Sequence, residues 1–200
     1  MSMTLVGLVG SSVQSGRTRK AVELAAAAAV EANAALLLDI VDLSKDRVAI
    51  LDGRSMDQYP DGTASVISRL AAGDLFIIGT PVYRGTYTGA LKNVLDHLPL
   101  EALEGKVVAL IATGATSHHY LSIDHELRGV LAWFNAYLLP GSVYLEHSAY
   151  AEGELKDQGK RSALAELGKS LVEVHSRLRG VVPKPACLAR ASMKSARPNA

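Results

Sequence analysis

The stretch DLFIIGTPVYRGTYTGALKNVLD, residues 74–96, joins an apolar strand to a helix through a loop of unusual composition. The run DLFIIG has the length of a buried strand, and the helix is expected to begin near residue 87. Residues 81–89, before the helix is under way, include a proline, an arginine, two tyrosines and two glycines. A shaped loop at the end of a strand is where α/β proteins bind their ligands.

The same alternation of strand and helix extends over most of the chain. Strands are expected at 3–9, 35–43, 74–79, 106–112 and 142–147, and helices at 17–34, 63–72, 87–97, 119–136 and 159–179. The central strands are continuously apolar, as in a sheet with helices on both faces. The pattern predicts an α/β fold with a parallel, doubly wound sheet. Ligands of such sheets bind at the carboxyl ends of the strands, which directs attention to residues 10–18, 80–87 and 113–118.

Length and composition limit the possible classes of protein. Two hundred residues suit one domain, expected at 1–180, followed by a disordered basic tail at 181–200. No apolar run reaches the roughly 18 residues of a membrane span, and no signal peptide is recognised. A net charge of +1 does not indicate nucleic-acid binding. The single cysteine, Cys187, has no internal disulfide partner, which favours the cytoplasm.

Residues 10–18, GSSVQSGRT, open a helix and predict an anion site. The free N–H groups and the positive dipole end of a helix start attract an anion. Ser11 and Thr18 add hydroxyl donors, and Arg17 adds a positive charge. The loop lacks the third glycine of GxGxxG, and a P-loop would need glycine at position 11 and lysine at position 17. An ordinary serine-capped helix start, with no ligand, is the alternative interpretation.

Residues 80–87 offer backbone and flat side chains to a planar ligand. Pro81 fixes one backbone dihedral, Gly85 permits close approach of a ligand, and Tyr83 and Tyr87 present flat faces and hydroxyls. With an anion at residues 10–18, the ligand would be a planar heterocycle carrying a phosphate, a description that suits flavin mononucleotide (FMN). Tyrosines that only anchor the loop by packing are the alternative.

The segment TPVYRGTYTGALKNVLDHLP, residues 80–99, resembles the flavin-binding segment of the NADPH-dependent FMN reductase family. The family pattern is close to P-x-Y-x-G-x-Y-S-G-x-L-K-N-x-L-D, and Thr88 replaces its serine. Residues 102–131, ALEGKVVALIATGATSHHYLSIDHELRGVL, are similar to the reductases of two-component sulfonate monooxygenase systems. The first loop departs from the family pattern G-S-x-R-x-x-S, because Val13 replaces the arginine and Gly16 the second serine.

The resemblance implies a flavodoxin-like three-layer sandwich with a five-stranded parallel sheet of order 2-1-3-4-5. It implies an enzyme that passes hydride from NADPH or NADH to FMN and supplies reduced FMN to a partner monooxygenase. A homodimer or homotetramer is expected. No side chain is assigned as catalytic, because the flavin itself carries the chemistry. By family position, the flavin contacts are expected at Ser11, Arg17 and Thr18 for the phosphate and at Pro81, Val82, Tyr83, Arg84, Thr113, Gly114, Ala115 and His118 for the ring.

Other functions remain to be distinguished from this one. An enzyme of the same fold that retains FMN would reduce a quinone or an azo compound. A flavodoxin-type electron carrier is disfavoured because such carriers are strongly acidic and this chain is not. No metal site is expected, because His118 and His125 lie two helical turns apart, about 10.5 Å, too far for one zinc ion.

Overall fold

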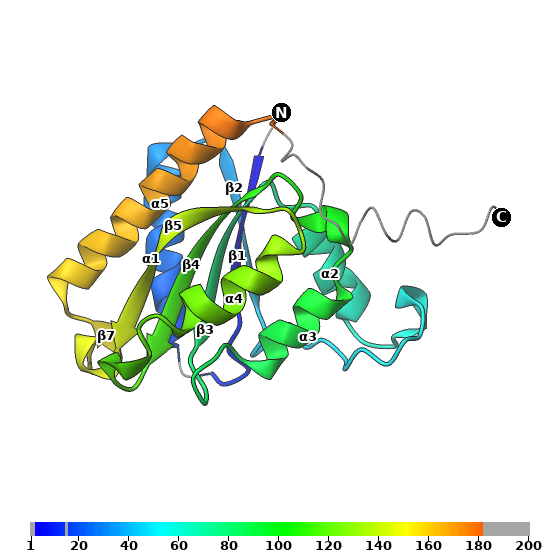
Figure 1. The fold of residues 1–200 in the computed structure, drawn as a ribbon, viewed down its shortest axis with the longest axis horizontal. Coiled ribbons are helices and arrows are strands. Elements are labelled where there is room, and N and C mark those ends of the chain that lie inside the picture. Colours follow the sequence, from blue (N-terminus) through cyan, green and yellow to red (C-terminus); the bar gives the residue numbers. More distant parts are fainter. Residues whose placement is uncertain (1–2, 15, 182–200) are drawn as a thin grey trace.

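A computed structural model describes residues 3–14 and 16–181 and shows one parallel sheet covered by helices (Figure 1). The sheet has five strands in the order β2-β1-β3-β4-β5, and every neighbouring pair is parallel. Its strands are β1 (Met3–Val9), β2 (Leu36–Asp42), β3 (Leu75–Pro81), β4 (Val107–Gly114) and β5 (Tyr137–Glu146). The predicted fold class and strand order are therefore confirmed. The basic tail predicted at 181–200 lies, apart from Val181, outside the described residues.

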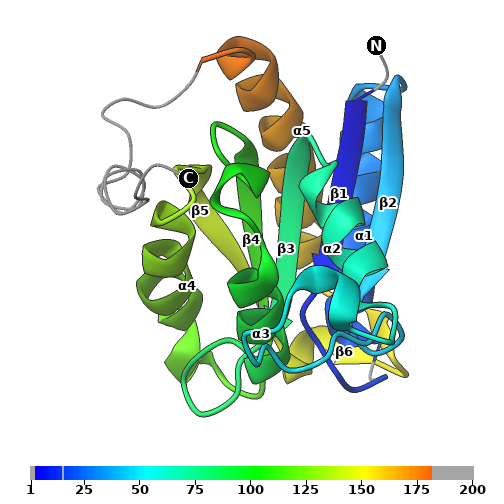
Figure 2. The same cartoon turned by 90° about the vertical axis from the view of Figure 1, so that its right-hand side faces the viewer.

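The helices form two layers, one on each face of the sheet (Figures 1 and 2). On one face lie α1 (Arg17–Ala32) and α5 (Gln158–Leu178), and on the other lie α2 (Thr63–Ala71), α3 (Gly89–His97) and α4 (Ser122–Ala132). The alternation of side chains along each strand feeds both layers. In β3, Phe76 and Ile78 join the core under α2, α3 and α4, whereas Leu75 and Ile77 join the core under α1 and α5.

Short 3₁₀ helices and a small hairpin occupy several connections. The 3₁₀ helices span Met56–Gln58, Leu100–Ala102, Ser117–His119 and His147–Ala149. Strands β6 (Tyr150–Ala151) and β7 (Glu154–Leu155) pair antiparallel after β5. The turn between them has positive φ at Glu152 (51°) and Gly153 (77°), the type I′ geometry that joins two strands tightly. Within the described residues, no helix has both the length and the hydropathy of a membrane span.

The helix expected at 119–136 is shorter in the structure, and the fifth strand begins earlier than expected. After α4 ends at Ala132, Asn135 takes a left-handed φ of 53°, a conformation that stops a helix. The strand then begins at Tyr137, but its register with β4 shifts between Val108 and Leu110, where Pro140 and Gly141 interrupt the ladder. This irregularity explains why the sequence pattern predicts only the second half of β5.

The alanine run of α1 allows α5 to cross it at very short range. Ala25, Ala26 and Ala29 are fully buried. A Cβ placed on Gly168 of α5 would lie 2.1 Å from the Ala25 carbonyl oxygen. Because that atom belongs to the backbone of a packed helix, no side chain can rotate away to relieve the overlap. The two helices are therefore locked together by residues without bulk.

We expect Gly168→Ala to lower the free energy of unfolding by about 1–3 kcal/mol, because the added methyl group forces the two backbones apart. Gly129→Ala in α4 is the matched control, since a Cβ there meets nothing within 4 Å. The control should raise stability by roughly 0.5–1 kcal/mol, the helix propensity difference. Urea unfolding monitored by circular dichroism measures both. A stable Gly168→Ala protein would contradict the close contact.

Candidate functional site

The loops after β1, β3 and β4 lie together at the carboxyl edge of the sheet, the lower edge in Figure 1. Since these strands are neighbours in register, their ends meet: Val9 pairs with Gly79, and Pro81 pairs with Thr113. Hydrogen bonds continue past the strands, from the Gly10 N–H to the Gly79 carbonyl (2.7 Å) and from the Val82 N–H to the Thr113 carbonyl (2.8 Å). The expected convergence of the three loops is therefore present.

A cavity of about 390 Å³ opens between these loops. It gathers many of the residues that the sequence singles out, namely Arg17, Pro81, Val82, Tyr83, Thr113, Gly114 and Ala115. Its remaining lining residues are Val13, Leu145, Glu146, His147 and Tyr150. One end is therefore cationic and lies at the start of α1, and the other consists largely of backbone and apolar side chains from β3 and β4.

The backbone N–H groups at the start of α1 are candidate donors for a ligand. Gly16 precedes the helix with a left-handed φ of 73°, and no side chain caps the helix. No described residue accepts a hydrogen bond from the N–H groups of Arg17, Thr18 or Arg19. Free N–H groups at the positive end of a helix dipole bind anions. This end of the cavity is therefore suited to a phosphate.

Ser11 and Thr18 do not line this cavity. They line a neighbouring cavity of about 250 Å³ on the other side of the first loop, towards the end of β2, and Val13 borders both spaces. Both hydroxyls are buried and already engaged. Ser11 Oγ donates to the Val13 carbonyl (2.9 Å), and Thr18 Oγ1 bonds Thr113 Oγ1 (2.7 Å). In this arrangement they shape the loop, whereas Arg17 faces the larger cavity.

Arg84 and His118 also lie away from the cavity lining. The chain reverses over Tyr83–Thr86, where the Tyr83 N–H donates to the Thr86 carbonyl (2.9 Å). Arg84 (φ 54°) and Gly85 (φ 83°) form its tip, so the Arg84 side chain is exposed beyond the cavity. His118 is exposed too and bonds the Thr116 hydroxyl through Nδ1 (3.1 Å). Among residues 3–14 and 16–181, no three His, Cys, Asp or Glu side chains cluster as a metal site requires.

Thr88 connects the first two loops. Its hydroxyl accepts from the Leu91 N–H (3.1 Å) and caps α3, and it donates to the Gly10 carbonyl. Its own N–H donates to Thr80 Oγ1 (3.3 Å). A single buried residue therefore fixes the start of α3, the end of β3 and the beginning of the first loop.

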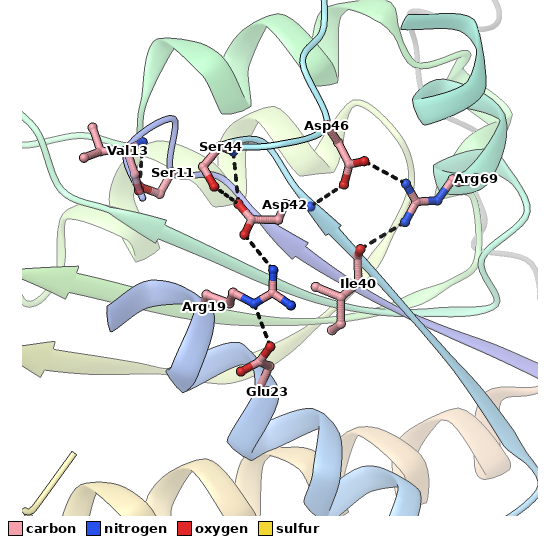
Figure 3. A network of polar contacts seen from close by, with 9 residues as sticks. All are labelled: Ser11, Val13, Arg19, Glu23, Ile40, Asp42, Ser44, Asp46 and Arg69. Carbon is pink, nitrogen blue, oxygen red and sulfur yellow. Dashed lines mark hydrogen bonds and ion pairs between the residues drawn. The ribbon is translucent and has the colours of Figure 1, made fainter. Parts of the chain in front are cut away.

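Arg19 ties the first turn of α1 to the end of β2 (Figure 3). Its guanidinium donates to Asp42 Oδ2 (2.9 Å) and to Glu23 Oε1 (2.7 Å). The other oxygen of Asp42 accepts from the Ser44 hydroxyl and N–H. Burial alone would raise the pKa of Asp42, but the hydrogen bonds from Ser44 and Arg19 outweigh it and hold the pKa below its ordinary value.

Comparison with known protein families matches residues 3–150 to the family described as NADPH-dependent FMN reductase. The chain belongs to this family. Membership makes it a flavin-reducing oxidoreductase whose implied cofactors are FMN and NAD(P)H.

Individual relatives agree with this assignment. The chain is 37% identical over 139 residues to an NAD(P)H-dependent FAD/FMN reductase of Geobacillus thermodenitrificans, covering 69% of this chain and 75% of the relative. It is 33% identical over 122 residues to the NADH-dependent FMN reductase SfnF of Pseudomonas fluorescens, covering 61% and 64%. The solved structure of FerB, an NAD(P)H:acceptor oxidoreductase of Paracoccus denitrificans, superposes with a TM-score of 0.71 at 18% identity over 88% of this chain and 98% of that one. This last likeness concerns the fold.

The cavity of this flavin reductase fits FMN by the chemistry of its donors. Arg17 and the N–H groups at the start of α1, which have no acceptor among the described residues, suit the phosphate. At the other end, position 114 has no room for a side chain, because a Cβ there would lie 1.8 Å from the hydroxyl oxygen of Tyr144. Tyr144 in turn donates to the Thr116 carbonyl (2.7 Å) and so holds the loop after β4.

Sequence reasoning missed the residues that the fifth strand contributes to the cavity of this reductase. Leu145 and Glu146 end β5, and His147 and Tyr150 follow it. A signal existed, because β5 is parallel to its neighbours and its carboxyl end must reach the same edge of the sheet. The motifs in the sequence direct attention only to the loops after the first, third and fourth strands.

We expect Thr88→Val to lower the free energy of unfolding by about 1–3 kcal/mol, because it removes a helix cap and leaves the Gly10 carbonyl without its donor. Thr88→Ser keeps the hydroxyl and should stay within about 0.5 kcal/mol of the unchanged protein. Urea unfolding curves compare the three proteins. A stable Thr88→Val protein beside a destabilised Thr88→Ser protein would show that the methyl group, and not the hydroxyl, matters.

The lowered pKa of Asp42 predicts a pH dependence. Its stabilising contribution is complete above the unfolded-state pKa, about 3.9, and disappears as the pH falls through the lower folded-state pKa. Asp42→Asn should therefore be less stable than the unchanged protein near neutral pH, and the gap should narrow below about pH 4. Unfolding midpoints measured between about pH 6 and pH 3 test this. A constant gap would contradict it.

Proposed function

We propose that the protein reduces FMN with NAD(P)H and releases the reduced flavin to a partner monooxygenase. The observation that supports this most directly is one cavity whose lining includes both Arg17, at the start of α1, and residues at the ends of β3 and β4. A phosphate and a planar ring connected by a flexible chain match these two ends.

Each lining segment has a separate task in this proposal. Arg17 and the N–H groups at the start of α1 hold the phosphate by charge-assisted hydrogen bonds. Pro81, Val82 and Tyr83 at the end of β3, and Thr113, Gly114 and Ala115 at the neighbouring end of β4, would hold the ring. When bound, FMN supplies the hydride chemistry. The chain orients the two reactants, and no side chain needs to exchange a proton with them.

The partner and the setting extend this proposal. SfnF is described as an NADH-dependent FMN reductase, and the segment 102–131 resembles reductases of sulfonate monooxygenase systems. We therefore place the monooxygenase partner in that class. The protein acts in the cytoplasm as a homodimer or homotetramer. Ser11, Thr18, Arg84 and His118 stay predicted flavin contacts, each of which requires a local change in the loops described here.

Steady-state oxidation of NADPH and NADH tests the proposal, with FMN, FAD, riboflavin and a quinone as separate acceptors. We expect turnover with FMN and release of FMN from the purified protein on dilution. Turnover with the quinone alone, with FMN retained, would replace the proposed function by that of a quinone reductase. A protein that binds FMN but oxidises neither nucleotide would be an electron carrier.

Arg17→Gln tests the phosphate assignment. Because a hydrogen bond to a charged group contributes roughly 1.5–3 kcal/mol, KM for FMN should rise about tenfold or more, while KM for riboflavin, which lacks the phosphate, should stay unchanged. Arg47→Gln is the control, because Arg47 is exposed and lies outside the cavity lining. An equal rise for both flavins in Arg17→Gln would place the phosphate elsewhere.

A further inference from the structure

The β6–β7 hairpin lies against the first turn of α1. The Tyr150 hydroxyl donates to the Arg17 carbonyl (3.1 Å) across 133 positions of sequence. Lys20 Nζ donates to the Gly153 carbonyl at the hairpin turn (2.7 Å) and pairs with Glu154. The hairpin is thus attached to Arg17 and to Lys20, the two ends of the first turn of α1.

Every residue of this helical turn is held by a part of the molecule outside α1. Arg17 is held by Tyr150, Thr18 by Thr113 of β4, Arg19 by Asp42 of β2, and Lys20 by the hairpin turn. The position of the Arg17 guanidinium depends on its own backbone, and Tyr150 makes the side-chain bond to that backbone. Small displacements of a binding group weaken its interaction with a ligand strongly.

Tyr150 is suited to this task because its hydroxyl stays a donor. The side chain lines the cavity and is partly buried. Burial raises the pKa of Tyr150 to about 12, and nearby Arg17 lowers it only in part. The phenol therefore keeps its proton at neutral pH, and its hydroxyl can donate to the Arg17 carbonyl.

We infer that Tyr150 is a positioning residue that holds Arg17 at the phosphate end of the cavity and thereby favours phosphorylated flavin over riboflavin. The inference rests on the proposed function, in which Arg17 binds the FMN phosphate. It assigns a role in flavin selectivity to the hairpin after β5, a part of the chain outside the loops that bind the ring.

The chain contains a matched comparison. Tyr144 also donates its hydroxyl to a backbone carbonyl, that of Thr116 (2.7 Å), but in the loop after β4 at the ring end of the cavity. Removing either hydroxyl deletes the same kind of bond at opposite ends of the site. Tyr120 is exposed, lies outside the cavity lining and serves as the neutral control.

The experiment measures kcat and KM for FMN and for riboflavin, with NADPH at saturation, in Tyr150→Phe, Tyr144→Phe and Tyr120→Phe. Tyr150→Phe should raise KM for FMN roughly three- to tenfold, with kcat and the riboflavin KM within about twofold. Tyr144→Phe should change both flavins in parallel, and Tyr120→Phe neither. An equal effect of Tyr150→Phe on both flavins, or none on FMN, overturns the inference.

The double variant Arg17→Gln with Tyr150→Phe separates positioning from direct contact with the phosphate. If Tyr150 acts by holding Arg17, the second change adds less than about twofold to KM for FMN. If the two effects multiply, Tyr150 acts independently and the positioning role is wrong. Failure of the proposed function looks different, because the unchanged protein would then show no turnover with FMN.

Discussion

The structure depends most on the first turn of α1, which is fixed from several sides while the N–H groups of Arg17, Thr18 and Arg19 have no acceptor among the described residues. Side chains from β4, from the end of β2 and from the β6–β7 hairpin hold Arg17 to Lys20. None of these bonds uses the N–H groups that an anion needs. These polar contacts fix the position of the helix without occupying the N–H groups at its start, which is the arrangement that preorganised binding requires.

The rest of the fold supports this turn from below. Small residues let α5 pack closely against α1, and the parallel register brings the ends of β1, β3 and β4 to a common edge. Thr88 then joins the first loop to the start of α3. Packing and hydrogen bonding thus position the same segments, the start of α1 and the ends of β3 and β4, and these segments line the cavity.

The sequence was sufficient for the fold and for much of the cavity, for a physical reason. Continuous apolar runs specify buried parallel strands, and a parallel sheet sends its carboxyl ends to one edge. The hydrogen-bond partners of individual hydroxyl groups could not be predicted from it. The Thr18 hydroxyl is hydrogen-bonded to that of Thr113, which is 95 positions away, and no local sequence pattern predicts that bond. The sequence pattern does not predict the early start of β5, because Pro140 and Gly141 interrupt the ladder. It does not predict the role of Tyr150 either, because the partner is the backbone carbonyl of Arg17, and every residue has a backbone carbonyl.

The crossing of α1 and α5 also bears on the order in which the molecule is made. The ribosome produces α1 early, whereas Gly168 and the hairpin that contact α1 come near the end of the described chain. The nascent chain therefore lacks these supports of α1 until the hairpin and Gly168 have been synthesised. Contacts so distant in sequence slow folding, so the phosphate end of the cavity depends on residues made long after α1.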